Sequence, residues 1–146
     1  MKKVREDMTT HVETLDPDLN VQDAARKMKE YDYGFLPVLE GGRVAGALTD
    51  RDITVRVIAE ARDPVRTRVR DIMTRDVVTA REDDELETVY EIMKERQLRR
   101  LPVVDAQRRL VGMITLARIA RDQGEEAAGE ILKEVVTPPA PTSPPA

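Results

Sequence analysis

Apolar residues follow helical spacing in two stretches of the chain, and two short apolar runs come after each stretch. Residues 18–30 predict an amphipathic helix, with these positions on one face: Leu19, Val21, Ala24, Ala25 and Met28. Residues 84–97 repeat the spacing and predict a second helix. The short runs predict β-strands over residues 35–39, 43–48, 101–105 and 109–114. A short extended segment is expected at residues 12–14, and further helices are expected over residues 50–61 and 116–121.

The sequence itself is repeated along with the order of elements. Val4–Thr9 recurs as Val69–Thr74, and Leu36-Pro37-Val38 recurs as Leu101-Pro102-Val103, both 65 positions later. After the predicted hairpin turn at Gly41-Gly42, the matches continue at an offset of 66, as at Thr49 and Thr115. A register kept over this length indicates an internal duplication of one βαββα unit in the α/β (α+β) class.

The repeats predict the domain boundaries. The first repeat spans residues 1–61, a linker follows at 62–68, and the second repeat spans residues 69–122. Residues 123–136 predict one more amphipathic helix. Residues 137–146 hold five of the nine prolines, which is typical of a disordered tail.

The amino-acid composition limits the kinds of catalytic site and metal site that the chain can form. The chain has no Cys, one His (His11) and one Ser (Ser143), so most nucleophile–base arrangements and Cys-type metal sites are excluded. We therefore expect neither an enzyme nor a metal centre. A net charge of −4 argues against a nucleic-acid partner. No signal sequence or membrane-spanning run is apparent, so a cytoplasmic protein without a membrane partner is expected.

Two motifs carry a family resemblance. Leu48-Thr49-Asp50-Arg51-Asp52-Ile53 and Arg99-Arg100-Leu101-Pro102-Val103, set in βαββα repeats, resemble the CBS domain, and two such domains in tandem resemble a Bateman module. The resemblance covers about residues 4–122 and extends to small stand-alone bacterial proteins with two CBS domains. It implies repeats related by a pseudo-two-fold axis, two clefts between them, and a disc-like homodimer. In the family, such clefts take AMP, ADP, ATP or related adenosyl compounds.

The resemblance implies one well-equipped cleft. Asp52 would accept hydrogen bonds from the ribose hydroxyls, with the Thr49 hydroxyl near a phosphate. From these four residues alone, Thr49-x-x-Asp52 is better explained as a helix cap, whereas the repeat context favours ribose binding, and both roles can coexist. Leu98 would touch adenine, and Arg99 and Arg100 would hold phosphates, although the two arginines also suit a solvated turn at a helix C-terminus. Backbone and apolar groups of Val77, Val78 and Thr79 would line the adenine, or would simply form a buried strand.

The second cleft lacks several of the ligand-binding residue types of the first. It would use these residues: Val12, Thr14, Tyr33, Thr115 and Arg118. Arg118 stands where the first repeat has Asp52, and Gly34 and Phe35 stand where the second repeat has Arg99 and Arg100. The ribose acceptor and the phosphate-binding pair are therefore both missing. Arg118 is expected to be a surface helix residue, with an ion pair to a phosphate as the alternative.

These features together predict a non-catalytic regulatory module that senses energy or stress through a bound adenine nucleotide. Its output would pass through a homodimer interface or an unidentified protein effector, and no required cofactor is expected. The alternative is a CBS-fold dimer that binds no ligand and serves as a structural or interaction scaffold.

Overall fold

The structure is a computed structural model that describes residues 2–123. Within these residues the chain divides into two compact units. One unit contains His11–Val78 and Val104–Leu110, and the other contains the residues up to Thr10, Thr79–Val103 and the residues from Val111 onward. The predicted helix over 123–136 and the predicted tail over 137–146 lie outside the described residues, apart from Gln123 at the end of the last helix. Each unit is described by itself below.

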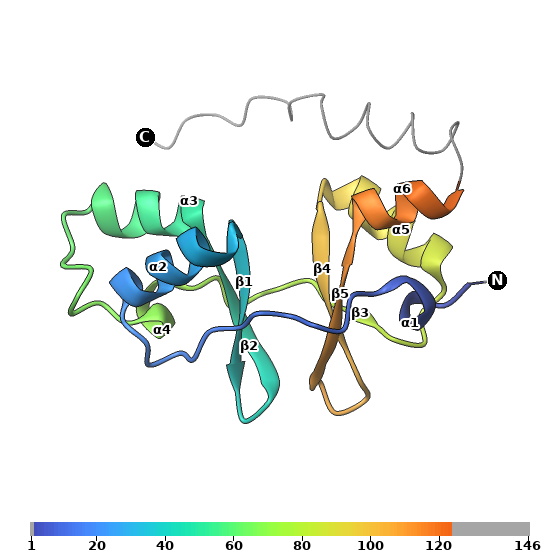
Figure 1. Cartoon of the computed structure of the whole chain (residues 1–146), viewed down its shortest axis with the longest axis horizontal. Helices are drawn as coiled ribbons and strands as arrows, with labels where there is room; N and C mark the ends of the chain where they lie inside the picture. The colour runs from blue at the N-terminus through green and yellow to red at the C-terminus, as the bar shows by residue number, and fades with distance from the viewer. Residues whose placement is uncertain (1, 124–146) are drawn as a thin grey trace. The chain divides into compact units, whose positions relative to one another are not determined.

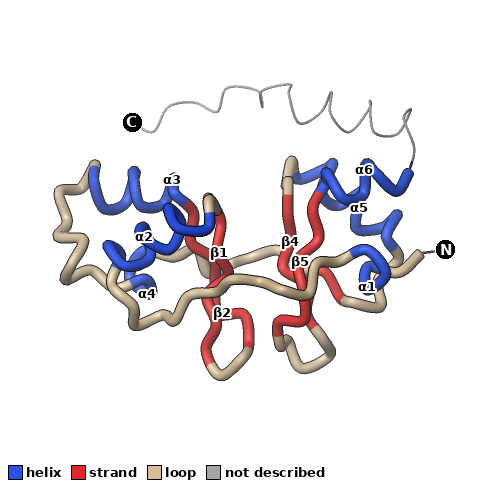
Figure 2. The backbone as a smooth tube through the Cα atoms, viewed as in Figure 1, coloured by secondary structure: helices blue, strands red, loops and turns tan. Residues whose placement is uncertain are grey.

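The His11–Val78 unit is built on a two-stranded antiparallel hairpin with helices beside it (Figures 1 and 2). Its elements are α2 (Val21–Tyr31), β1 (Phe35–Glu40), β2 (Arg43–Thr49), α3 (Asp50–Ile53), the π-helical turn η1 (Thr54–Ile58) and α4 (Val69–Ile72). The hairpin turn is confirmed, because Gly41 and Gly42 both have positive φ angles, as a tight two-residue turn requires.

The other unit contains a three-stranded sheet of order β3-β4-β5. Its elements are α1 (Val4–Asp7), β3 (Ala80–Arg81), α5 (Leu86–Arg96), β4 (Arg100–Val104), β5 (Leu110–Thr115) and α6 (Leu116–Gln123). β4 and β5 run across the boundary between the two contact-defined units at their hairpin ends.

The helices predicted over residues 18–30 and 84–97 are present as α2 and α5, but both begin later than predicted. α2 begins at Val21 and not at residue 18, because the Asn20 side chain accepts a hydrogen bond from the Asp23 N–H at 2.8 Å and caps the helix there. α2 ends at Tyr31 and is followed by its C-cap Asp32, whose φ is +56°, and α5 ends at Arg96 and is followed in the same way by Gln97, whose φ is +55°.

Two predictions about elements are wrong in detail. The extended segment at 12–14 forms no ladder, and pairing begins at Leu15, which bridges Val38 in parallel. Leu15 is the buried residue of that stretch, at 2% exposure, so burial selects it for the sheet. The helix predicted over 50–61 is an α-helical turn followed by the π-helical turn η1.

Two four-residue helices, α1 and α4, were not predicted, and they bind to elements of the opposite repeat. In one unit, the Val69 N–H donates to Leu19 O and the Val21 N–H donates to Thr67 O, each at 2.9 Å. In the other unit, the bonds at matching positions run from Val4 to Asp84 at 3.0 Å and from Leu86 to Lys2 at 2.9 Å. α4, which begins the second sequence repeat, therefore belongs to the His11–Val78 unit, and α1, which begins the first repeat, belongs to the other unit.

The core of the His11–Val78 unit joins the hairpin, α2 and α4. It includes Leu36, Val38 and Leu48 from the hairpin, and Val69, Ile72 and Met73 from α4 and its end. Within residues 2–123, every helix falls short of the length and apolarity that a membrane crossing needs.

Candidate functional site

Thr49 and Asp52 form a reciprocal cap where β2 passes into α3. The Asp52 N–H donates to Thr49 Oγ1, and the Thr49 N–H donates to Asp52 Oδ2, both at 3.0 Å. Asp52 is only 9% exposed, so its carboxylate is largely buried. The capping interpretation of Thr49-x-x-Asp52 is therefore correct. Because capping occupies only part of the carboxylate's acceptor capacity, a ligand role is compatible with it.

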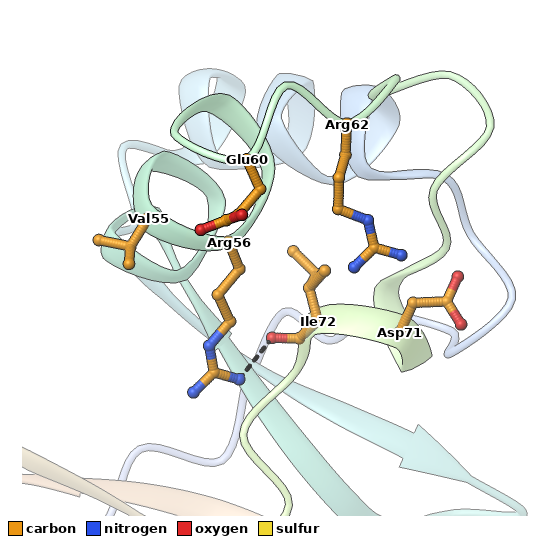
Figure 3. A pocket seen from close by; sticks show the side chains of 6 residues that line it. All are labelled: Val55, Arg56, Glu60, Arg62, Asp71 and Ile72. Atoms are coloured by element: carbon orange, nitrogen blue, oxygen red, sulfur yellow. Dashed lines mark hydrogen bonds between the residues drawn. The ribbon is translucent and has the colours of Figure 1, made fainter.

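The other carboxylate oxygen of Asp52 faces a residue that the sequence did not single out. Asp52 Oδ1 lies 3.8 Å from Nε of Arg56, four residues later. Nη1 of Arg56 donates to the backbone carbonyl of Ile72 at 2.9 Å (Figure 3). It also donates to the backbone carbonyl of Met73 at 3.3 Å. The i, i+4 spacing places Asp52 and Arg56 on one helical face, but the two carbonyls could not be anticipated from local sequence.

Arg56 also borders an open surface pocket of about 500 Å³. Figure 3 shows the residues that line it: Val55, Arg56, Glu60, Arg62, Asp71 and Ile72. The pocket's lining carries two cationic and two anionic side chains, and it includes none of the site residues predicted from the sequence.

Val77 and Val78 belong to the same compact unit as Thr49 and Asp52. The segment that leads to them is fixed on β2, because Thr74 and Ala47 exchange two backbone hydrogen bonds of 2.9 Å. Val77, Val78 and Thr79 are half-buried and lie outside any strand, since β3 begins only at Ala80. The alternative of a simple buried strand is therefore wrong for these three residues.

Leu98 and Arg99 lie in the other unit between α5 and β4, and Arg100 is the first residue of β4. The Leu98 N–H donates to Met93 O and the Arg99 carbonyl accepts from the Leu116 N–H, both at 2.9 Å. Arg99 is exposed, whereas Leu98 and Arg100 are half-buried. The backbone of this turn is thus fixed at the helix and strand ends that flank it.

The predicted residues of the first cleft are divided between the units. Thr49, Asp52, Val77 and Val78 belong to one unit, whereas Thr79 and Leu98–Arg100 belong to the other. That these two groups share one cleft stays a prediction.

The predicted second cleft is divided in the same way. Thr115 Oγ1 accepts from the Arg118 N–H at 3.2 Å, which repeats half of the Thr49–Asp52 cap without the carboxylate. Arg118 is exposed, as a surface residue should be. In the other unit, Tyr33 is 40% exposed and stacks on Tyr31, with ring centroids 6.2 Å apart.

Charged groups surround Val12 and Thr14 in that unit. The carboxylate of Glu13 lies 3.4 Å from Nζ of Lys27, and Lys27 also donates to the Thr14 carbonyl. The Glu13 charge is the main reason that the pKa of Tyr31 is raised above its usual value. His11 is exposed and lies 3.3 Å from Glu13.

The comparison with known families decides what the repeats are. A model of the CBS domain matches residues 4–58 and again residues 69–124. The chain belongs to the CBS domain family. The sequence-based resemblance is thereby confirmed, and the mixed α/β architecture described above is that of a CBS domain pair.

Relatives of similar length support the assignment. The CBS domain-containing protein YhcV of Bacillus subtilis is 40% identical over 136 residues, which cover 92% of this chain and 96% of that protein. Hypoxic response protein 1 of Mycobacterium tuberculosis is 31% identical over 94% of this chain and 96% of that protein. Both matches run over nearly the whole relative, so the region similar to this chain makes up nearly all of each of these two stand-alone CBS proteins.

Solved CBS structures add information about ligands. The crystal structure of hypoxic response protein I with two coordinated zinc ions has a TM-score of 0.75 at 33% identity, covering 84% of this chain and 99% of that one. The CBS domain pair of protein MJ0100, in complex with 5′-methylthioadenosine and S-adenosyl-L-methionine, has a TM-score of 0.70 at 28% identity, covering 82% of this chain and 94% of that one.

The zinc chemistry of that relative does not fit the donors present here. The chain contains no Cys, and its one His is His11. Among residues 2–123, no group of three or more His, Cys, Asp or Glu side chains is arranged to hold a metal ion. A protein zinc site usually needs three or four such ligands, and the part of the chain that the structure describes brings no such set together.

Proposed function

We propose that this CBS pair is a regulatory module, without catalytic activity of its own, that binds an adenine nucleotide or a related adenosyl compound. The observation that carries the proposal is the arrangement of the Asp52 carboxylate. Its Oδ2 is oriented by the Thr49 N–H, whereas its Oδ1 has an ion-pair contact and, within the described residues, no hydrogen bond. An oriented carboxylate with acceptor capacity left is suited to the paired hydroxyls of a ribose.

The rest of the ligand would be held by the other predicted residues of the first cleft. Backbone and apolar groups of Val77–Thr79, with Leu98, would contact the adenine. Arg99 and Arg100 would bind phosphates, because guanidinium groups form bidentate, permanently charged contacts with phosphate oxygens. The MJ0100 complex supports the adenosyl part of this proposal, since that related CBS pair carries two adenosyl compounds.

Regulation requires that the ligand bind one arrangement of the module better than another. We propose that occupancy is read by a homodimer interface or by a protein effector. The second cleft, with Gly34 and Phe35 in place of the arginine pair, is proposed to bind phosphorylated ligands more weakly or not at all.

Calorimetric titration of the full chain with AMP, ADP, ATP and 5′-methylthioadenosine tests the proposal. Asp52→Asn keeps the cap geometry but removes the charge, so it should weaken ADP binding by about tenfold or more, the value of a charge-assisted hydrogen bond of roughly 1.5–3 kcal/mol. Glu91→Gln, an exposed charge removal on α5, is the matched control and should leave the affinity unchanged. ADP should bind more tightly than 5′-methylthioadenosine if the arginine pair holds phosphate.

Absence of binding by every one of these compounds at millimolar concentration would reject the sensor proposal. That outcome would favour the ligand-free scaffold. Equal ADP affinity in the wild-type chain and Asp52→Asn would instead reject the assigned ribose acceptor.

A further inference from the structure

Arg56 connects the proposed ribose acceptor to a distant part of the same unit. It lies in η1, one turn after Asp52, and its guanidinium donates to the carbonyl of Ile72 (Figure 3) and to that of Met73. Ile72 is the last residue of α4, and Met73 is its C-cap. The final carbonyls of a helix lack partners within the helix, and a cation is favourable beside them, so Arg56 satisfies two such groups.

The contact with Asp52 has a different character. At 3.8 Å, Nε of Arg56 is close enough to stabilise the charge of the carboxylate but too far for a hydrogen bond. The acceptor positions of Oδ1 are therefore not consumed by Arg56. The guanidinium is hydrogen-bonded to backbone and leaves the carboxylate available to a hydroxyl donor.

The chain that follows α4 leads directly to the proposed adenine-lining segment. Thr74 is bound to Ala47 of β2 by two backbone hydrogen bonds, and Val77 and Val78 come next. A change at Asp52 can thus reach this segment through one side chain, Arg56, and one fixed turn, Met73–Thr74.

The second repeat lacks this connection. The residue that matches Arg56 is Asp122, and the residue that matches Ile72 is Asp7. Lys2 lies between these two carboxylates and forms ion pairs with both. The Arg56 arrangement is therefore particular to the repeat that also carries Asp52.

We infer that Arg56 is a positioning residue that couples Asp52 to the C-terminal end of α4, so that ribose binding is transmitted to residues 74–78. The identity of the ligand rests on the proposed function, but the coupling itself is a property of the free protein. The two parts are therefore tested separately.

Hydrogen exchange in the free protein tests the coupling. The Met73 and Thr74 amides are both hydrogen-bonded, to Val69 O and Ala47 O, so their exchange rates report opening of this turn. Asp52→Asn should speed their exchange by about threefold in the wild-type background and by much less in Arg56→Met. Arg51→Met removes an exposed arginine from the same helix and should preserve the full Asp52→Asn effect. Effects that simply add in the double variant would overturn the inference.

A comparison of ADP with 2′,3′-dideoxy-ADP tests the transmission. Arg56→Met should weaken ADP binding by about fivefold and leave binding of the dideoxy compound unchanged, because only ADP offers hydroxyls to Asp52. Arg56→Lys retains the charge and should recover part of the ADP affinity. At saturation, ADP should slow Met73 and Thr74 exchange in the wild-type chain but not in Arg56→Met.

The outcomes separate the inference from the proposed function. Equal weakening of both ligands would assign Arg56 a purely structural role and overturn the inference. Failure of the wild-type chain to bind ADP would reject the proposed function, while the exchange experiment would still decide the coupling.

Discussion

Asp52 and its counterpart Arg118 show what single residues contribute to a duplicated fold. Both positions place a backbone N–H on a threonine hydroxyl, but only Asp52 returns a side-chain hydrogen bond to the threonine. The Thr-x-x-Asp spacing was enough to predict the cap at Thr49 and Asp52, and the replacement of Asp by Arg118 was enough to predict that the second repeat lacks the matching carboxylate. Arg56 was not predicted, because its hydrogen-bond partners are backbone carbonyls 16 and 17 positions away, which no side-chain pattern encodes.

Asp7 provides a residue-scale prediction about pH. Burial raises the pKa of Asp7, and the nearby Asp122 carboxyl raises it further, against the opposing effect of Lys2. A raised folded-state pKa stabilises the fold below the usual aspartate value near 4 and loses this contribution as the pH rises through the folded pKa. Asp7→Asn should therefore raise the Tm at pH 7 by on the order of 2 °C, and the gain should shrink to nothing in acid.

Asp18→Asn is the matched control with the opposite sign. The Arg70 side chain, 2.8 Å away, and then Arg68 lower the pKa of Asp18. This contribution is present above the usual aspartate pKa and is lost as the pH falls through the lowered folded value, so Asp18→Asn should lower the Tm at pH 7 but not at pH 2. Thermal melts between pH 2 and pH 7 measure both differences. A loss of stability in Asp7→Asn at neutral pH would contradict the prediction.

At the scale of elements, the sequence was most informative where one face of an element is buried. The helical spacing around Met28 and Met93 and the apolar runs around Val38 and Val103 predicted α2, α5 and the two hairpins. α1 and α4 were missed, because a four-residue helix is too short to show a period. η1 was missed because π-helical structure is rare and occurs mostly as single turns within α-helices, so an ordinary helix was predicted there.

Gly46 in β2 lies where the chain that follows α4 approaches the strand closely, and this contact can be tested by substitution. A Cβ atom at Gly46 would lie 2.6 Å from the Thr74 carbonyl oxygen and 2.9 Å from Met73 Sδ. Gly112 is equally restricted by Thr9 O and Met8 Sδ, each at 2.8 Å. Because backbone atoms cannot move aside without breaking the Ala47–Thr74 bridge, Gly46→Ala should destabilise the protein by about 2 kcal/mol, typical of overpacking.

Urea unfolding measures this cost, and the hairpin turn supplies the control. Nothing lies within 4 Å of a Cβ added at Gly41, and asparagine tolerates the left-handed backbone found there. Gly41→Asn should change the free energy of unfolding by less than about 0.5 kcal/mol. If Gly46→Ala were as mild as this control, the close approach of Thr74 to β2 would not be a real constraint.

At the scale of the whole molecule, the compact units and the sequence repeats do not coincide. The repeats predicted a boundary at residues 62–68, whereas α4, which follows that linker, packs into the core with Leu36 and Leu48. The offset of 65 residues shows that two segments have similar sequences. It does not show which of the two repeats each segment packs against. Comparison of the sequence with itself therefore could not predict that α1 and α4 are exchanged between the repeats. The CBS resemblance itself was confirmed.

The exchange predicts which fragment of the chain can fold alone. A fragment of residues 11–78 contains the whole of one compact unit except Val104–Leu110, whereas a fragment of residues 1–66 follows the first repeat and lacks α4. Val69, Ile72 and Met73 are all at least 95% buried in the core of that unit. Burying each of three such side chains contributes about 1.5–3 kcal/mol, and their sum is comparable to the whole stability of a small domain.

We therefore expect cooperative urea unfolding and helical circular dichroism for residues 11–78, and neither for residues 1–66. Ile72→Asp in the fragment of residues 11–78 should abolish its cooperative unfolding transition, because a charge would replace a side chain that is 1% exposed. Cooperative folding of residues 1–66 without α4 would show that the sequence repeat, and not the exchanged unit, is the folding unit of this chain.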